Sequence, residues 1–363
     1  MKLTLVAGAR PNFMKIAPII DAIKKAQLDG IKISYRLVHT GQHFDANMSA
    51  EFFQQLAIPE PDINLECSGK TQSELTGAIM IAFEKELKKN PCDLVVVVGD
   101  VTSTMACTIV AKKLCVDVAH VEGGIRSGDM TMPEEINRIV TDAISDYFFT
   151  TSRLANQNLI EKGVPESKVF FVGNTMIDSL LKHQNRFQKP QFYHEFKLEQ
   201  GNYFVLTLHR PSNVDDEHNL AHILHVIEES VHNCPIVFPV HPRTAKVLQK
   251  IPLKTSNFHF VTPMNYLEFN FLVSNSKAVI TDSGGVTEET TVLGIPCMTL
   301  RAYTERPETV NLGTNELIGT NPEKLKPALK KLFHGKWKKG TIPEMWDGKT
   351  AERIVAIIDK RYN

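Results

Sequence analysis

The chain has 363 residues, of which 42% are hydrophobic, and this length suits two globular domains of ordinary size. It carries 41 basic and 41 acidic side chains, so its formal net charge is zero and a nucleic-acid partner is not expected. The sequence contains no apolar run of the roughly 20 residues that a membrane span needs, and its start does not have the pattern of a signal peptide. The six cysteines form no Cys-x-x-Cys pair, which favours reduced thiols in a cytoplasmic protein.

Short apolar, β-branched segments alternate with longer helical patterns along the chain. Strands are predicted over Lys2–Ala7, Ile33–Thr40, Leu94–Val98, Asp117–Val121, Tyr147–Thr150, Val169–Val172, Tyr203–Leu208, Pro235–Val240, Phe258–Val261, Ala278–Thr281 and Cys297–Leu300. Most are continuous hydrophobic runs, which is typical of parallel strands that are buried on both faces. Helices are predicted between them, including Pro11–Lys25, Gln72–Lys89, Thr102–Leu114, Pro133–Ile144 and Asn219–Asn233. The alternation predicts an α/β fold of the doubly wound, Rossmann-like type.

A domain boundary is expected near Gly173, because a polar and weakly patterned stretch at about 182–200 separates two series of strands. The sequence therefore predicts an N-terminal domain over 1–172 and a C-terminal domain over 173–347, with a C-terminal helix at 348–363 that could pack back on the first. Doubly wound folds bind ligands outside the carboxyl ends of their strands. The two domains are thus expected to face each other across a cleft, lined by the residues that follow strands.

The segment Asp282–Glu289, DSGGVTEE, follows the predicted strand Ala278–Thr281. Its Ser-Gly-Gly turn lets the backbone approach an anion, and the helix that follows directs the positive end of its dipole at a phosphate. Glu288 or Glu289 could accept hydrogen bonds from the hydroxyls of a ribose. The alternative is an ordinary glycine turn with a capping box formed by Ser283 and Glu288.

Basic side chains at two further strand ends could bind a diphosphate. Arg301 and Arg306 lie in RAYTERPE after the strand Cys297–Leu300, and planar guanidinium groups suit phosphate oxygens. Arg10 and Lys15 follow the first strand, in a segment that lacks the GxGxxG pattern of dinucleotide-binding proteins. The alternative for each of them is a solvated surface charge.

Acidic residues follow the strands of the first domain and are candidates for acid–base chemistry. Asp100 closes VVVVGD, Glu122 closes AHVEGG, and Glu134 lies in MPEEINR at the start of a helix. Glycines beside them would let a substrate approach closely. The alternative is an N-cap or first-turn acid that stabilises its own helix.

Histidine and arginine residues follow two strands of the second domain. His209 and Arg210 come after Tyr203–Leu208, and His241 and Arg243 come after the next strand. Such a histidine could neutralise a phosphate or protonate a leaving group, or it could be structural. The other histidines are interpreted as structural or surface residues, with zinc binding as a lesser alternative for His218, His222 and His225.

An ordered set of motifs runs from residue 1 to about residue 320: GARPNFMKIAP, TGQHFD, VVVVGDVTST, HVEGGIRSGDMTMPEEINR, VGNTMIDSL, LHRPSN, PVHPRT, DSGGVTEE and TERPETV. Together they resemble the non-hydrolysing UDP-N-acetylglucosamine 2-epimerases. The resemblance implies two Rossmann-like domains of the GT-B type and a cytoplasmic homodimer that needs no metal or redox cofactor. The implied reaction eliminates UDP to give 2-acetamidoglucal and re-adds it with the opposite configuration at C2. It would interconvert UDP-GlcNAc and UDP-ManNAc for the synthesis of a cell-surface polysaccharide.

The resemblance also implies roles for residues at matching positions. Asp100, Glu122 and Glu134 resemble the acid–base carboxylates, with the choice between Glu134 and Glu135 left open, and His209 resembles the catalytic histidine. The implied UDP-binding set is Arg10, Lys15, Phe269, Ser283, Gly284, Gly285, Glu289 and Arg306, and Arg210 and His241 join it by their position after strands. The segment Gln42–Asp45 departs from the pattern of relatives that the substrate regulates, so a second substrate site is not expected.

Three other functions remain open. A hydrolysing epimerase would release free N-acetylmannosamine and UDP. A GT-B glycosyltransferase would transfer the sugar to an acceptor. A catalytically silent sensor would only bind the nucleotide-sugar.

Overall fold

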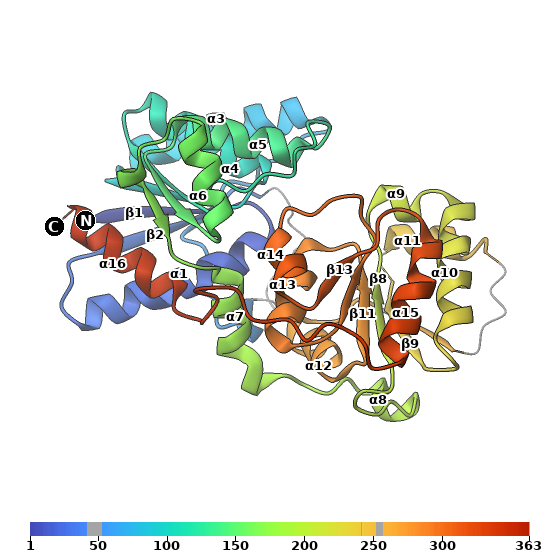
Figure 1. The fold of residues 1–363 in the computed structure, drawn as a ribbon. Coiled ribbons are helices and arrows are strands. Elements are labelled where there is room, and N and C mark those ends of the chain that lie inside the picture. Colours follow the sequence, from blue (N-terminus) through green and yellow to red (C-terminus); the bar gives the residue numbers. More distant parts are fainter. Residues whose placement is uncertain (42–52, 241, 252–256, 363) are drawn as a thin grey trace. The chain divides into compact units, whose positions relative to one another are not determined.

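The computed structural model describes residues 1–41, 53–240, 242–251 and 257–362 (Figure 1). The chain divides into two compact units, of which unit 1 is Met1–Lys182 with Glu344–Asn363 and unit 2 is His183–Pro343. None of the described helices is both long enough and apolar enough to cross a membrane.

Unit 1 is built on a seven-stranded sheet in the order β3-β2-β1-β4-β5-β6-β7, and every strand pair is parallel. Its strands are β1 (Lys2–Ala7), β2 (Ser34–His39), β3 (Ile63–Asn64), β4 (Leu94–Val98), β5 (Asp117–Val121), β6 (Tyr147–Thr150) and β7 (Val169–Phe171). The central strand β4 is buried along its whole length, as its apolar run predicts. The strand order reverses between β1 and β4, which is where doubly wound folds place their ligands.

Helices cover both faces of this sheet. They are α1 (Arg10–Leu28), α3 (Gln72–Lys89), α4 (Thr102–Lys113), α5 (Pro133–Ile144), α6 (Arg153–Glu161), α7 (Thr175–His183) and α16 (Thr350–Tyr362), with a 3-10 turn at Glu166–Lys168. Helices α3, α4 and α5 pack in a row on one face, and α1 and α16 pack together on the other (Figure 1). Helix α3 begins at Gln72 because the Thr71 hydroxyl accepts the Glu74 N–H at 3.1 Å in a capping box.

The segment after Pro343 returns to unit 1. Trp346 is buried and its indole N–H donates to the Thr151 carbonyl at 3.2 Å. The Asp178 carboxylate accepts the Thr350 and Ala351 N–H groups at 3.2 and 2.7 Å, and so caps the start of α16. These contacts make α16 part of the first unit's core.

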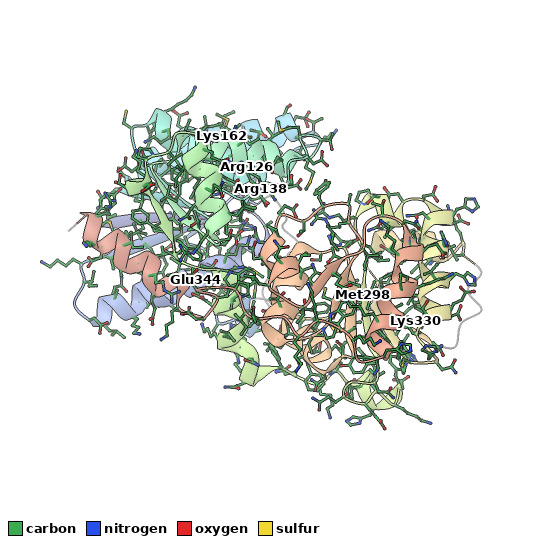
Figure 2. The ribbon with its side chains drawn as sticks, viewed as in Figure 1. Arg126, Arg138, Lys162, Met298, Lys330 and Glu344 are labelled. Carbon is green, nitrogen blue, oxygen red and sulfur yellow. The ribbon has the colours of Figure 1, made fainter. Side chains whose placement is uncertain are left out.

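Unit 2 contains a six-stranded parallel sheet in the order β10-β9-β8-β11-β12-β13. Its strands are β8 (Phe204–Thr207), β9 (Ile236–Pro239), β10 (Phe258–Val261), β11 (Ala278–Thr281), β12 (Cys297–Thr299) and β13 (Asn315–Leu317). Alternate residues of these strands enter two hydrophobic clusters, so both faces are buried. Met298, labelled in Figure 2, lies in one cluster, and the adjacent Cys297 lies in the other.

The helices of unit 2 are α8 (Phe192–Glu195), α9 (Pro211–Val214), α10 (Glu217–Ser230), α11 (Pro242–Leu248), α12 (Tyr266–Asn275), α13 (Gly284–Leu293), α14 (Pro307–Asn311) and α15 (Leu325–Phe333), with 3-10 turns at Gln184–Arg186 and Pro322–Lys324. The order of its strands reverses between β8 and β11, as in unit 1. The predicted doubly wound α/β fold is therefore confirmed for each unit.

Candidate functional site

Glu122 stands at the carboxyl end of β5, and the structure places it beside Lys15 of α1. The Lys15 Nζ lies 2.7 Å from Glu122 Oε2, and the Glu122 side chain is only 3% exposed. The backbone of Glu122 has a φ of 71°, a region that non-glycine residues rarely adopt, and its N–H is held by the Phe149 carbonyl at 2.9 Å. The two residues form a buried ion pair, so the alternative of a solvated surface charge is wrong for Lys15.

The turn after β4 approaches this ion pair closely. Gly99 has a φ of 68°, and a Cβ atom there would lie 3.1 Å from the Lys15 Nζ. Asn12 joins the turns after β1 and β4, because its Oδ1 accepts the Gly8 and Ala9 N–H groups at 3.1 and 2.9 Å and its Nδ2 donates to the Val98 carbonyl at 3.0 Å. Sequence reasoning missed Asn12, although an asparagine just inside a helix after a strand-end turn was the available signal.

Asp100, the next predicted acid, is held by residues of α5. Its carboxylate forms an ion pair with Arg138, and its backbone carbonyl accepts a hydrogen bond from Asn137 Nδ2 at 2.9 Å. Figure 2 labels Arg138, which lies in unit 1 with its side chain almost fully buried. A short-range pairing of this kind fixes the direction of the Asp100 carboxylate.

Glu134 and Glu135 have different surroundings at the start of α5. Glu135 is buried, and its carboxylate accepts the Ser127 N–H at 2.9 Å and pairs with Arg138 at 2.8 Å. Burial opposes its ionisation, but these donors outweigh burial and hold the pKa of Glu135 below its ordinary value. Glu134 is half-buried beside it. Glu135 is therefore linked to Asp100 through Arg138, while Glu134 is a candidate by its position.

In unit 2, Asp282 follows β11 and organises the loop after β8. Its fully buried carboxylate accepts the Arg210 N–H at 2.9 Å and Asn213 Nδ2 at 3.0 Å, and it lies 2.7 Å from His209 Nδ1. Burial opposes its ionisation, but His209 and the other donors hold the pKa of Asp282 below its ordinary value. The His209 side chain is 52% exposed, so the Asp282 carboxylate orients an imidazole that solvent can reach.

The N-terminus of α13 is open. Ser283 is its N-cap residue, but the serine side chain accepts no capping hydrogen bond, so the capping-box alternative is wrong. A Cβ atom added to Gly285 would meet no heavy atom of the described residues within 4 Å, and one added to Gly284 would meet only Arg301 Nη1, at 3.7 Å. The described residues therefore leave space beside the first two residues of this helix, while the Ser283 N–H donates to Thr281 Oγ1 at 3.0 Å.

The two arginines of the RAYTERPE segment are buried and paired. The Arg301 guanidinium forms two hydrogen bonds of 2.8 Å with the Glu305 carboxylate, and the Arg306 Nε pairs with Glu288. Both arginines are 9% exposed or less, so the alternative of a solvated surface pair is wrong. Because Glu288 is engaged with Arg306, Glu289 is the remaining candidate of the two for accepting hydrogen bonds from a ligand.

Glu289 is buried on α13 between two polar side chains of α12. Burial raises the pKa of Glu289 to about 7, although Tyr266 and Asn270 beside it act in the opposite direction. A carboxyl group with this pKa gains and loses its proton near neutral pH.

Comparison with known proteins decides the family. The profile of the UDP-N-acetylglucosamine 2-epimerase family matches residues 26–359. The chain belongs to the UDP-N-acetylglucosamine 2-epimerase family. It is 42% identical to the UDP-N-acetylglucosamine 2-epimerase of Methanocaldococcus jannaschii, with 99% of each chain covered. The resemblance to this family is thereby confirmed.

A solved structure and a further relative extend the comparison. The crystal structure of the Methanocaldococcus jannaschii UDP-GlcNAc 2-epimerase in complex with UDP-GlcNAc and UDP matches with a TM-score of 0.87 and 42% identity, over 99% of this chain and 100% of that one. The UDP-2,3-diacetamido-2,3-dideoxy-D-glucuronate 2-epimerase of Pseudomonas aeruginosa is 41% identical over 88% of each chain. The match to this solved epimerase structure confirms the GT-B-like fold class.

The remaining predicted residues of this family member have varied surroundings. Arg10 begins α1, and Phe269 on α12 is partly buried against a hydrophobic cluster of unit 2. The Arg210 Nε is buried and makes no hydrogen bond within the described parts of the chain. His241 lies outside the described residues, as do Gln42–Asp45.

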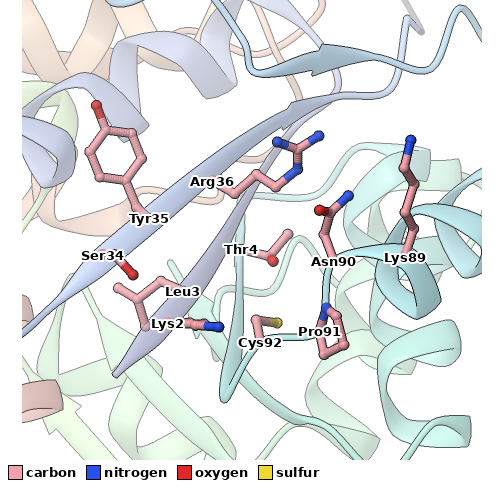
Figure 3. A pocket seen from close by; sticks show the side chains of 10 residues that line it. All are labelled: Lys2, Leu3, Thr4, Ser34, Tyr35, Arg36, Lys89, Asn90, Pro91 and Cys92. Carbon is pink, nitrogen blue, oxygen red and sulfur yellow. The ribbon is translucent and has the colours of Figure 1, made fainter.

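One pocket of this epimerase-family chain lies away from the predicted residues. A pocket of about 300 Å³ at the amino ends of β1, β2 and β4 is lined by polar groups that include Lys2, Arg36 and Cys92 (Figure 3). It occupies the opposite edge of the sheet from Asp100 and Glu122. Among the described residues, no group of three or more His, Cys, Asp or Glu side chains could hold a metal ion.

Proposed function

We propose that this chain is a non-hydrolysing UDP-N-acetylglucosamine 2-epimerase that interconverts UDP-GlcNAc and UDP-ManNAc. The observation that carries the proposal is the different chemistry of the two strand-end regions. Unit 1 holds carboxylates in fixed positions, which suits proton removal and return at a sugar carbon. Unit 2 presents an open helix N-terminus near a carboxylate-oriented histidine, which suits a diphosphate leaving group.

The acid–base role is assigned to Asp100, Glu122 and Glu134. Elimination of UDP needs a base that removes the C2 proton, and re-addition needs an acid that returns a proton on the other face. Lys15, 2.7 Å from Glu122, balances the charge of that carboxylate. Arg138 does the same for Asp100. Positioned acid–base groups of this kind typically contribute about 10²–10⁴-fold each to the rate.

Most of the UDP-binding role is assigned to unit 2, with Arg10 and Lys15 of unit 1 as the remaining candidates. The backbone N–H groups of Gly284 and Gly285 and the hydroxyl of Ser283 would bind the diphosphate, and Glu289 would accept the ribose hydroxyls. With Nδ1 bound to Asp282, the His209 ring can offer Nε2 to the phosphate oxygen that departs from C1. Stabilising the departing charge in this way lowers the barrier to elimination.

Solvent exchange at C2 tests the proposal. The purified protein is incubated with UDP-GlcNAc in deuterated water, and deuterium is expected at C2 of both epimers with UDP still attached. Free N-acetylmannosamine with stoichiometric UDP would mean a hydrolysing epimerase. UDP release that requires an acceptor, without exchange at C2, would mean a glycosyltransferase, and binding without exchange would mean a sensor.

The sugar substrate needs its own test, because the two relatives with different substrates are 42% and 41% identical to this chain. We propose UDP-GlcNAc, since the relative named for it is covered over 99% of its length. The same exchange assay with UDP-2,3-diacetamido-2,3-dideoxy-D-glucuronate provides the comparison. Faster exchange on that sugar would change the substrate and leave the 2-epimerisation in place.

We also propose that the enzyme is a cytoplasmic homodimer. Apolar side chains are exposed on the row of helices α3, α4 and α5: Ile81 is 60% exposed, Ile136 44% and Ile139 38%. Exposed apolar groups gathered on one face favour an interface between copies. Sedimentation of the wild-type protein and of the Ile136→Asp variant checks this, since the dimer should be lost only in the variant.

A further inference from the structure

His120, inside β5, is buried and is held at both ring nitrogens. Its Nδ1 lies 2.7 Å from Asp142 Oδ1, and its Nε2 lies 2.8 Å from the Gly99 carbonyl oxygen. A carbonyl oxygen only accepts, so Nε2 is the donor in that bond. Burial opposes ionisation of Asp142, but His120 and Arg126 outweigh it and hold the pKa of Asp142 below its ordinary value. The Asp142 carboxylate therefore accepts from Nδ1.

Asp142 uses its other oxygen on a different loop. Its Oδ2 accepts the Gly124 N–H at 3.0 Å and pairs with Arg126 Nη1 at 2.6 Å. Gly124 lies two residues after Glu122, in the loop that leaves β5. One buried carboxylate thus binds the loop after β5 directly and, through His120, the loop after β4.

Gly99 is held by hydrogen bonds at the peptide units on both of its sides. Its N–H donates to the Val121 carbonyl at 3.0 Å, and its carbonyl accepts from the His120 ring at 2.8 Å. Gly99 immediately precedes Asp100 and has a φ of 68°. The direction in which Asp100 leaves the sheet is therefore set by the residues that hold Gly99.

We propose that His120 and Asp142 are positioning residues for the acid–base step: by fixing Gly99 and Gly124 they set the placement of Asp100 relative to Glu122. This inference rests on the proposed function. Reacting groups must be held to within a fraction of an ångström, and a displacement of about 1 Å can cost about 10²-fold in rate. Neither residue needs to touch the substrate to have this effect.

Two substitutions of His120 separate positioning from simple packing. In His120→Gln the amide nitrogen can replace Nε2 and donate to Gly99, whereas in His120→Asn it replaces Nδ1 and reaches only Asp142. We expect kcat for C2 exchange within about threefold of wild type in His120→Gln and lowered about 10- to 100-fold in His120→Asn, with similar losses of thermal stability. Equal kcat values in the two variants would overturn the inference.

Asp142→Asn tests the carboxylate, with Asp178→Asn as the matched control. Asp178 is a buried carboxylate of the same unit that accepts two backbone N–H groups of α16, so its substitution should lower Tm and leave kcat unchanged. Asp142→Asn should lower kcat at least tenfold and change KM by less than about threefold. Equal kcat in the two variants would mean that Asp142 is only structural.

An NMR measurement that needs no substrate tests the roles of His120 and Asp142 independently of the proposed function. If wild-type protein exchanges no deuterium on either sugar nucleotide, the proposed function has failed, and NMR of the His120 ring still reports on the hydrogen bonds. Two slowly exchanging ring N–H signals are expected in wild type, and loss of the Nδ1–H signal is expected in Asp142→Asn. A single ring N–H signal in wild type would overturn the inference whatever the activity.

Discussion

The two units place different chemical groups at the same position of the same fold. At the strand ends of unit 1, cations hold carboxylates, as Lys15 holds Glu122. At the strand ends of unit 2, carboxylates hold an imidazole and backbone N–H groups, as Asp282 holds His209 and the Arg210 N–H, and a Cβ atom at Gly285 would meet no heavy atom of the described residues within 4 Å. A doubly wound sheet therefore determines where a site forms. The side chains and backbone groups at that place decide whether the site suits proton transfer or anion binding.

Glu122→Gln is the most direct test of the acid–base role assigned to the strand ends of unit 1. The variant removes the carboxylate and keeps the shape, so kcat should fall about 10²–10⁴-fold. UDP affinity should change much less than kcat, because most of the residues assigned to UDP lie on unit 2, although Lys15 pairs with Glu122. Exchange kinetics and calorimetric titration with UDP measure the two quantities.

Glu86→Gln is the matched control for Glu122→Gln. Glu86 is also a buried acid of unit 1, paired with Arg36 at 2.5 Å, but it lies on α3 away from the strand-end residues. We expect lower stability and an unchanged kcat. A kcat loss in Glu86→Gln as large as in Glu122→Gln would show that any buried ion pair of unit 1 matters equally.

The role assigned to unit 2 in UDP binding can be tested through the pH dependence of stability that Glu289 causes. Its pKa rises from 4.5 to about 7 on folding, so the folded state binds the proton more tightly than the unfolded state does. The unfolding free energy of the wild type should therefore fall as the pH rises from about 4.5 to about 7, by up to about 3 kcal/mol. Glu289→Gln lacks this titration, so its stability relative to wild type should be higher at pH 8 than at pH 5.

Chemical denaturation of both proteins at pH 5 and pH 8 measures this difference. Binding gives a second readout, because an ionised Glu289 accepts hydrogen bonds from hydroxyl groups better than a protonated one. The affinity for UDP-GlcNAc should strengthen between pH 6 and pH 8 in wild type and stay flat in Glu289→Gln. A stability difference that does not change with pH would contradict the raised pKa.

The smallest substitution tests whether the N-terminus of α13 binds the diphosphate. In Gly285→Ala the added methyl group meets no heavy atom of the described residues within 4 Å, so stability should be unchanged or higher by up to about 1 kcal/mol. If the diphosphate lies against this backbone, UDP affinity should fall at least tenfold. Gly77→Ala on α3 also has open space around its Cβ, and it should leave UDP affinity unchanged.

Most of the fold could be predicted because its strands are contiguous apolar runs. The bounds of β1, β4 and β5 match those predicted from the sequence. The strands β3 and β13 were missed, since each has only two or three residues and lies at a sheet edge, where burial imposes little pattern.

The candidate site was predicted in part, for a physical reason. A residue that follows a strand is at the carboxyl edge of a parallel sheet wherever the strand lies, so sequence alone singled out Asp100 and Glu122. Their partners come from distant elements, and only the fold reveals that Asp142 binds His120. A histidine inside the apolar strand DVAHV was a usable signal, because a buried imidazole needs a polar partner.

The return of α16 to unit 1 has a consequence for how the two units depend on the end of the chain. Unit 2 is one continuous stretch, His183–Pro343, whereas unit 1 is complete only when Glu344–Asn363 has been added. Because unit 2 is contiguous, the stretch to which most UDP contacts are assigned does not need Trp346 or the helix behind it to complete its fold. The half assigned to proton transfer does need them, so loss of the last residues of the chain should impair the chemistry more than the binding of the nucleotide.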